Sequence, residues 1–265
     1  MRRIVYIFLF SVIYITVKCQ TQYDNALKRY YNGELSAAVD LFSQCIAGKE
    51  KTALSYMYRG AARAFLGSFD EAFNDLKTSY GLDSANDKIH YYFGKYYVLN
   101  KQYAHAAEYF KKSILRKKDD PDRYDALATA EIFLENYKNA VEHENQAIQL
   151  DPNQGDYFLN RGFAKLKLNQ YENAIRDLST SLSKEKSYKG YFDRAVAYSQ
   201  LKMYSKAIED FNASLSMYPE NAEAIYYRGL TFKYMDKKDE ACKDFKHSLT
   251  LGFTDATKAI DTYCR

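Results

Sequence analysis

Small residues recur along the chain at an almost constant interval. Seven alanines stand 33 or 34 residues apart. Each has Ala or Gly twelve residues before it, Ala, Ser or Cys seven residues after it, and Ile, Leu or Tyr eight residues after it. Such a period indicates a repeat architecture, in which one structural unit is copied along the chain. The seven alanines, called the anchors below, are Ala38, Ala72, Ala106, Ala140, Ala174, Ala207 and Ala241.

The spacing within one period predicts a pair of antiparallel helices. Small side chains at fixed offsets let two helix axes approach closely, and larger side chains fill the adjoining layers. Three residues before the anchor, a large apolar side chain is expected to close the turn, although Lys238 stands there in the last repeat. The chain has only 11 Gly and 3 Pro, which favours long helices over a turn-rich sandwich or barrel. The six closing residues are Leu35, Phe69, Tyr103, Tyr137, Tyr171 and Tyr204.

The chain resembles the tetratricopeptide repeat family over roughly residues 21–253. The segments YFLNRGFAKLKLNQYENAIRDLSTSL and AIYYRGLTFKYMDKKDEACKDFKHSL carry the resemblance most clearly. It implies an all-α fold, a right-handed α-solenoid of seven antiparallel helix pairs whose concave face holds a peptide or a helix of a partner protein. We therefore expect a signal peptide at 1–19, seven repeats at 20–253 and a capping helix at 254–265.

Two opposite charges appear together in four of the repeats. These repeats have Arg thirteen residues before the anchor and Asp three residues after it, whereas the other three repeats have neither charge. The two positions lie symmetrically about the turn, so we expect bidentate ion pairs between the two helices. The alternative is that the arginines are anion ligands lining a groove, but a paired Arg has little capacity left. The expected structural pairs are Arg59 with Asp75, Arg161 with Asp177, Arg194 with Asp210, and Arg228 with Asp244.

The resemblance places the concave face on the first helix of each repeat, at 18, 15, 11, 8 and 7 residues before the anchor. Side chains at these positions are mostly aromatic or aliphatic, in a chain with 27 Tyr and no Trp. Tyr provides much contact area at low entropic cost, although packing between helices is the alternative for any single Tyr. Some family members hold a terminal carboxylate with a Lys and Asn pair. That pair is missing here, so a carboxylate site of this kind is not expected. The candidates for partner contact are Tyr91, Lys95, Phe163, Phe192, Tyr226, Lys233 and Tyr234.

The amino-terminal segment predicts export. Two arginines precede an apolar run of 14 residues, Ile4–Val17, which is too short to span a bilayer and typical of a secretory signal. Cleavage after Cys19 lowers the net charge from +4 to +1, which leaves no basic excess for nucleic acid. One alternative is a lipoprotein signal in which Cys19 is acylated, which Lys18 disfavours. The other is an uncleaved anchor, which the short length disfavours.

Two cysteines near the carboxyl end are placed to form a disulfide. Cys242 lies about eleven residues before the turn that leads into the capping helix, and Cys264 lies about eleven residues after it. The antiparallel arrangement brings them level, and an exported protein can oxidise such a pair. The alternative is two small buried thiols. This end of the chain resembles the terminal repeats of exported Bacteroidetes tetratricopeptide proteins.

The sequence carries no recognisable catalytic motif. Phosphate-binding glycine loops, zinc-protease helices and nucleophile elbows are all missing, and the four histidines lie in different repeats. We expect no enzymatic activity, no cofactor and no metal. The function expected is an exported scaffold or adaptor, periplasmic or extracellular, that binds a protein partner and no nucleic acid. The alternative is a permanent structural subunit of an envelope or secretion complex, with or without a lipid anchor at Cys19.

Overall fold

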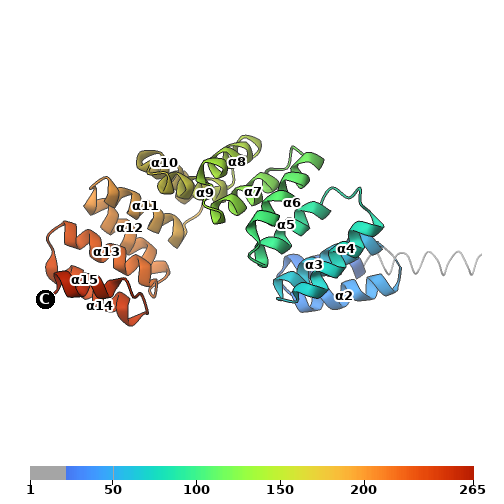
Figure 1. The fold of residues 1–265 in the computed structure, drawn as a ribbon, viewed down its shortest axis with the longest axis horizontal. Coiled ribbons are helices and arrows are strands. Elements are labelled where there is room, and N and C mark those ends of the chain that lie inside the picture. The colour runs from blue at the N-terminus through green and yellow to red at the C-terminus, as the bar shows by residue number, and fades with distance from the viewer. Residues whose placement is uncertain (1–21, 50) are drawn as a thin grey trace, which may run out of the picture. The chain divides into compact units, whose positions relative to one another are not determined.

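The computed structural model describes residues 22–49 and 51–265, and these contain helices and turns but no strand (Figure 1). The predicted signal segment lies outside the described residues. The chain divides into two compact units, which meet in sequence between Leu134 and Glu135 and are described separately here. After a first helix at residues 22–31, the helices are α2 (Leu35–Ala47), α3 (Thr52–Phe65), α4 (Phe69–Leu82), α5 (Ile89–Leu99), α6 (Tyr103–Arg116), α7 (Pro121–Phe133), α8 (Tyr137–Leu150), α9 (Gly155–Lys167), α10 (Tyr171–Lys184), α11 (Tyr188–Gln200), α12 (Tyr204–Met217), α13 (Ala222–Tyr234), α14 (Lys238–Thr250) and α15 (Ala256–Tyr263).

Consecutive helices pack as hairpins within each unit. The first unit contains the helix 22–31 with α2, then α3 with α4 and α5 with α6, followed by α7. The second unit contains α8, then α9 with α10, α11 with α12 and α13 with α14, followed by α15. Each hairpin also packs on the next one in its unit, as α4 does on α5 and α10 does on α11. The all-α solenoid of helix pairs predicted from the period is therefore confirmed.

The period predicts where the second helix of every hairpin begins. Each of these helices starts three residues before the anchor, at the position assigned to a turn-closing residue. Lys238 starts α14 in the same way, although it is charged. All seven anchors have no exposed surface. In the hairpins that lie within one unit, the anchor stands where the two helices approach closely. The small partner positions follow the same logic, since a Cβ added at Gly94 would lie 2.4 Å from the Phe110 ring.

Every hairpin turn has a left-handed residue at the same place. Five residues before each anchor, φ is positive, between 56° and 83°. Only two of these residues are Gly, and the other five are Lys101, Glu135, Asn169, Lys202 and Asp236. A left-handed residue just after a helix lets the next backbone N–H groups bond to the last carbonyls of that helix. The N–H of Gln170, for example, donates to the Lys165 carbonyl at 2.9 Å.

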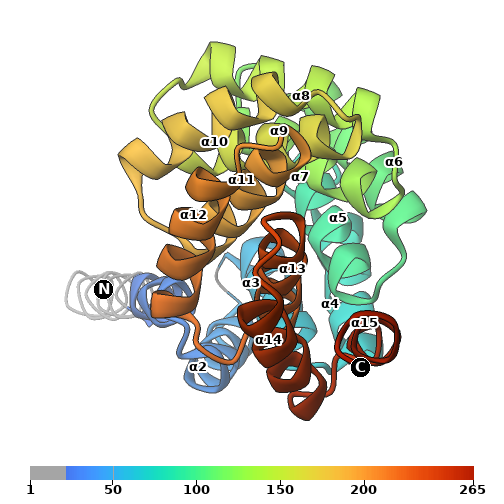
Figure 2. The ribbon, with the colours of Figure 1, turned by 90° about the vertical axis from the view of Figure 1, so that its left-hand side faces the viewer.

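A short helix covers the carboxyl end of the second unit. α15 packs on α14 (Figures 1 and 2), and its Ala259 and Ile260 join the cluster around Phe245. Cys242 of α14 and Cys264 form a disulfide, with their Cα atoms 5.6 Å apart. No described helix is long and apolar enough to cross a membrane.

Candidate functional site

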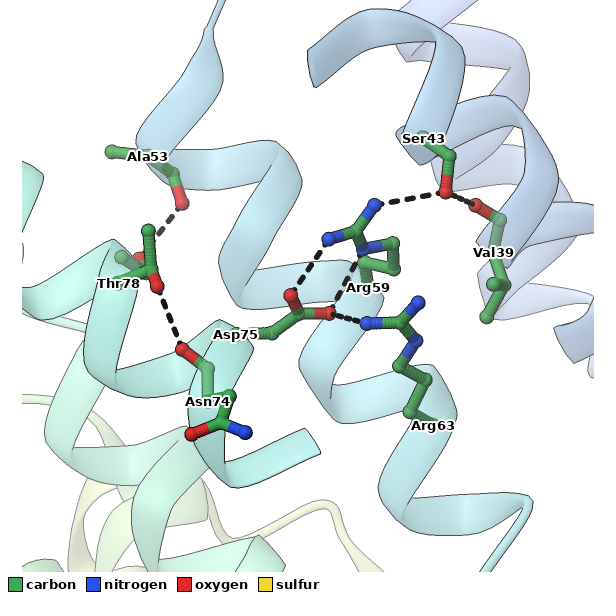
Figure 3. A network of polar contacts seen from close by, with 9 residues as sticks. Val39, Ser43, Ala53, Arg59, Arg63, Asn74, Asp75 and Thr78 are labelled. Atoms are coloured by element: carbon green, nitrogen blue, oxygen red, sulfur yellow. Dashed lines mark hydrogen bonds and ion pairs between the residues drawn. The ribbon is translucent and has the colours of Figure 1, made fainter. Parts of the chain in front are cut away.

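Four Arg side chains clamp the two helices of their hairpins together. Figure 3 shows one clamp, in which Arg59 donates from Nε and Nη2 to the two Asp75 oxygens at 2.8 and 2.7 Å. The other three predicted pairs have the same bidentate geometry, with distances of 2.6–2.8 Å. Asp75 Oδ2 also accepts a hydrogen bond from Arg63 Nη1 at 2.7 Å, and Asp177 Oδ2 accepts one from Lys165 Nζ at 2.7 Å. The paired guanidinium groups therefore have little donor capacity left for a ligand.

Each clamp also reaches the preceding hairpin, which the sequence analysis missed. The remaining Nη1 donates to a Ser or Asn five residues after the previous anchor, for example from Arg194 to Ser179 Oγ at 3.0 Å. Asn145 and Asn212 accept in the same way, as does Ser43. A sequence signal existed, because Lys stands at this position ahead of the repeats that lack Arg. The clamp thus fastens neighbouring repeats as well as the helices of one repeat.

Truncating one clamp arginine is expected to destabilise the second unit. In Arg194→Ala, the buried Asp210 carboxylate loses its two charge-assisted bonds, at a cost of about 2 to 3 kcal/mol. Urea unfolding followed by circular dichroism measures this loss. Arg176→Ala is the matched control, because Arg176 is exposed and its side chain donates to the exposed Asn173 side chain rather than to a buried acid. Equal midpoints for Arg194→Ala and the wild type would contradict the proposed role.

A cavity of about 540 Å³ opens in the first unit, on the first helices of its repeats. Two predicted contact residues, Tyr91 and Lys95, line it. Tyr31 and Phe65 line it too, and they are 67% and 45% exposed, so large aromatic surface faces the opening. The complete lining is Tyr30, Tyr31, Gly33, Leu35, Phe65, Lys88, Tyr91, Tyr92, Lys95, Asp120, Asp122 and Arg123.

Lys95 lies between two aromatic rings of this cavity. Its Nζ is 5.4 Å from the Phe65 centroid and 5.5 Å from the Tyr91 centroid, within the range of cation–π attraction. Burial lowers the pKa of Lys95, and the charge of Asp122 acts in the opposite direction. Burial also raises the pKa of Tyr91 far above its ordinary value, so its hydroxyl is a donor at neutral pH.

Arg123 forms the floor of the cavity and is almost completely buried, with 1% of its surface exposed. Its Nη1 donates to the carbonyl oxygens of Ser113 and Asp87 at 2.7 and 3.0 Å, and its Nη2 donates to Asp87 Oδ2 at 2.5 Å. Its Nε donates to Asp120 Oδ2 at 3.1 Å. A single side chain thus ties α7 to the end of α6 and to the loop before α5.

The other predicted contact residues lie in the second unit and differ in accessibility. Phe192 packs against Phe211 and Tyr227, and Tyr226 packs against Phe245 and Phe253, so both contribute to the core. The other three candidates make ring or charge contacts, and Tyr234 is the most exposed of the five. Phe163 lies under the Lys167 ammonium, Lys233 lies 5.2 Å from the Tyr263 ring, and Tyr234 is 63% exposed and stacks on Tyr204.

The cavity contains functional candidates that the prediction did not select. Tyr30, Tyr31 and Phe65 stand 8 or 7 residues before their anchors, so the same offsets applied to the first two repeats would have found them. Arg123 could not be found in this way. Its burial depends on contacts with Asp87, 36 residues earlier, which no repeated position encodes.

Comparisons with known proteins agree with this fold. Tetratricopeptide repeat models match residues 121–154 and 188–221. Human serine/threonine-protein phosphatase 5 is 29% identical over 117 residues, which are 40% of this chain and 23% of that protein. The chain spans only 15% to 23% of the length of the first curated relatives that it matches.

Two solved structures extend the similarity to most of the chain. A tetratricopeptide repeat protein from Parabacteroides merdae is 14% identical, covers 92% of this chain and all of its own, and has a TM-score of 0.64. YrrB, a protein with an unusual peptide-binding site, is 19% identical, covers 71% of this chain and 97% of its own, and has a TM-score of 0.58. At these identities the likeness is one of fold.

Proposed function

We propose that this chain, which contains tetratricopeptide repeats, is a scaffold that binds a peptide or helix of a partner protein in the cavity of its first unit. The observation that supports this proposal most strongly is the exposed aromatic surface of Tyr31 and Phe65 in a cavity that Lys95 also lines. Exposed rings in a concave site provide contact area at a small entropic cost. The peptide-binding site of YrrB is a precedent on the same fold.

The role that we propose is binding rather than catalysis. The similarity to phosphatase 5 lies in its repeat region and covers 23% of that protein, so the activity of the phosphatase does not transfer to this chain. Among residues 22–49 and 51–265, no three His, Cys, Asp or Glu side chains gather in a way that could hold a metal ion.

We further propose that the protein is exported to a periplasm or the extracellular space after removal of residues 1–19. The apolar run of Ile4–Val17 supports this proposal. The mass of the mature protein tests it, because cleavage after Cys19 leaves Gln20 as the first residue. A lipid on Cys19 would instead favour the anchored form, and a retained Met1 would contradict export.

Site-specific photocrosslinking tests the binding site. A photoreactive phenylalanine analogue replaces Phe65, which lines the cavity, or Tyr80, which does not, and the two residues are 45% and 42% exposed. We expect the Phe65 position, and not the Tyr80 position, to capture a discrete partner segment in the cells that make the protein. Equal capture at both positions would contradict a site in the cavity.

The captured segment is then synthesised as a peptide and titrated against the purified chain. Phe65→Ala is expected to weaken binding by about tenfold or more, whereas Tyr80→Ala leaves the Kd unchanged.

Isolation of the protein from its own cells at high salt distinguishes the two kinds of scaffold. A stoichiometric complex that survives high salt would favour a permanent structural subunit over a transient adaptor.

A further inference from the structure

Four tyrosines from three repeats contact one another beside the cavity, and three of them, Tyr30, Tyr31 and Tyr92, line it. Tyr30 and Tyr31 belong to the helix 22–31, Tyr58 belongs to α3 and Tyr92 belongs to α5. The ring centroids of Tyr30 and Tyr58 are 5.6 Å apart, and those of Tyr58 and Tyr92 are 5.3 Å apart. The hydroxyl oxygens of Tyr31 and Tyr58 are 3.4 Å apart. These four residues are called the tyrosine cluster.

The tyrosine cluster offers hydrogen-bond donors at neutral pH. Burial raises the pKa of Tyr30 and Tyr92 far above the ordinary value, and the neighbouring tyrosines add to this effect. Burial also raises the pKa of Tyr31, and the nearby Lys88 ammonium acts in the opposite direction. Hydroxyls that bond to one another in a chain leave one O–H at the end without an acceptor. Tyr31 lines the cavity and is 67% exposed, so its hydroxyl can meet a bound group.

Lys88 adds a positive charge beside the cluster. It lines the same cavity, and no carboxylate of the described residues lies within ion-pair distance of its ammonium group. The acids nearest to it in sequence are engaged elsewhere. Asp87 Oδ2 accepts from Arg123, and Asp83 Oδ1 accepts from the Ala85 N–H at 3.2 Å.

The lining of the cavity carries more positive than negative side chains. Its cations are Lys88, Lys95 and Arg123, and its acids are Asp120 and Asp122. Asp120 accepts from Arg123 Nε at 3.1 Å and lies 3.7 Å from Lys117 Nζ. The charge of Asp122 raises the pKa of Lys95, against the effect of burial. The lining therefore has an excess of one positive charge, and the tyrosine hydroxyls add hydrogen-bond donors.

We propose that the tyrosine cluster and Lys88 bind the carboxylate of an Asp or Glu side chain within the peptide that occupies the cavity. This inference rests on the proposed function and adds the chemical class of the partner. A carboxylate has acceptors and no donors, so it complements phenol O–H and ammonium groups, and its hydrogen bonds with them are charge-assisted. The exposed rings of Tyr31 and Phe65 would receive an apolar residue next to the acid.

Selection from a phage-displayed library of random dodecapeptides tests the proposal without knowledge of the natural partner. The purified chain is the bait, and its double variant Lys88→Met/Tyr31→Phe is selected in parallel. The matched control is Lys77→Met/Tyr80→Phe, which alters an exposed Lys and an exposed Tyr of the same unit outside the cavity. Circular dichroism verifies that all three proteins have the same helicity.

We expect the wild type and the control to enrich peptides with Asp or Glu beside an aromatic or aliphatic residue, and the cavity variant to lose this preference. An enriched peptide is then synthesised with an amidated carboxyl end, together with a version in which the acid is replaced by Asn or Gln. The replacement should weaken binding to the wild type at least tenfold and to Lys88→Met/Tyr31→Phe less than threefold, as a double-mutant cycle requires for a direct interaction.

Several results would overturn the inference. Enriched peptides without a preference for Asp or Glu would overturn it while leaving the proposed function intact. A preference for Asp or Glu that the cavity variant retains would have the same meaning. Binding that depends on a free terminal carboxylate and not on a side-chain acid would also overturn it. If no peptide is enriched the inference fails as well, and the photocrosslinking result then decides whether the proposed function fails with it.

Discussion

Replacing Arg123 by Met is expected to lower the free energy of unfolding of the first unit by about 3 to 5 kcal/mol. Met keeps much of the apolar volume but removes every donor that this buried side chain supplies. The Ser113 and Asp87 carbonyls lose their bonds to Nη1, and Asp87 and Asp120 lose a charged partner. Urea unfolding followed by circular dichroism measures the shift, and hydrogen exchange of α5, α6 and α7 locates it.

Arg116→Met is the control for this experiment, because Arg116 is an exposed residue at the end of α6 in the same unit. It is expected to change stability by less than about 0.5 kcal/mol. A midpoint for Arg123→Met that equals the control would show that the Arg123 contacts carry no net stabilisation. Arg123→Met should also weaken peptide binding, since Arg123 forms part of the cavity floor.

Replacing Asp193 by Asn is expected to stabilise the second unit at pH 8. The Asp193 side chain is 7% exposed, and burial raises its pKa from 3.8 to about 7. Glu223 adds to this rise, whereas Lys167 and Lys189 oppose it. Ionised Asp193 is therefore unfavourable in the folded chain, by an amount on the order of 4 kcal/mol for a shift of about three pKa units. Asn removes this penalty while keeping the shape of the side chain.

The stabilisation by Asp193→Asn is expected to grow as the pH rises. Between about pH 4 and pH 7, the folded chain holds a proton on Asp193 that the unfolded chain has lost, so stability falls as pH rises through this window. Below pH 4 both states are protonated, and Asp193→Asn should differ little from the wild type. Urea midpoints at pH 4, 6 and 8 measure the difference. Glu142→Gln, an exposed change in the same unit, should show no such trend, and parallel curves for Asp193→Asn and the wild type would contradict the prediction.

The features best predicted from the sequence are the hairpins and the ion pairs, because their residues recur at fixed offsets. The anchors fix the hairpins, because a small residue at a close helix approach has no substitute without a clash. The Arg and Asp pairing follows from the same symmetry. Their third partners, such as Ser179, also stand at a fixed offset from an anchor, but they were missed because Ser or Asn at that offset looks like any polar surface residue.

The cavity itself was only partly predictable. Tyr91 and Lys95 line the cavity, as their offsets from the anchor predict, whereas Phe192 and Tyr226, which stand at the same offset as Tyr91, do not line it. The difference arises from neighbours that the offsets do not describe. The pKa of Asp193 also depends on neighbours from three consecutive repeats, because Lys167, Lys189 and Glu223 modify the shift that burial causes.

The left-handed turn residues have a consequence for the ancestry of the chain. Six of these turns are closed by a backbone bond within their own hairpin, and Lys, Asn, Asp and Gly all occupy the left-handed position in them. The closure of these six turns therefore requires no particular side chain from another repeat. Gene duplication or deletion of one period would leave every remaining turn intact, so the array is free to lengthen or shorten by whole repeats while its hairpins keep their geometry.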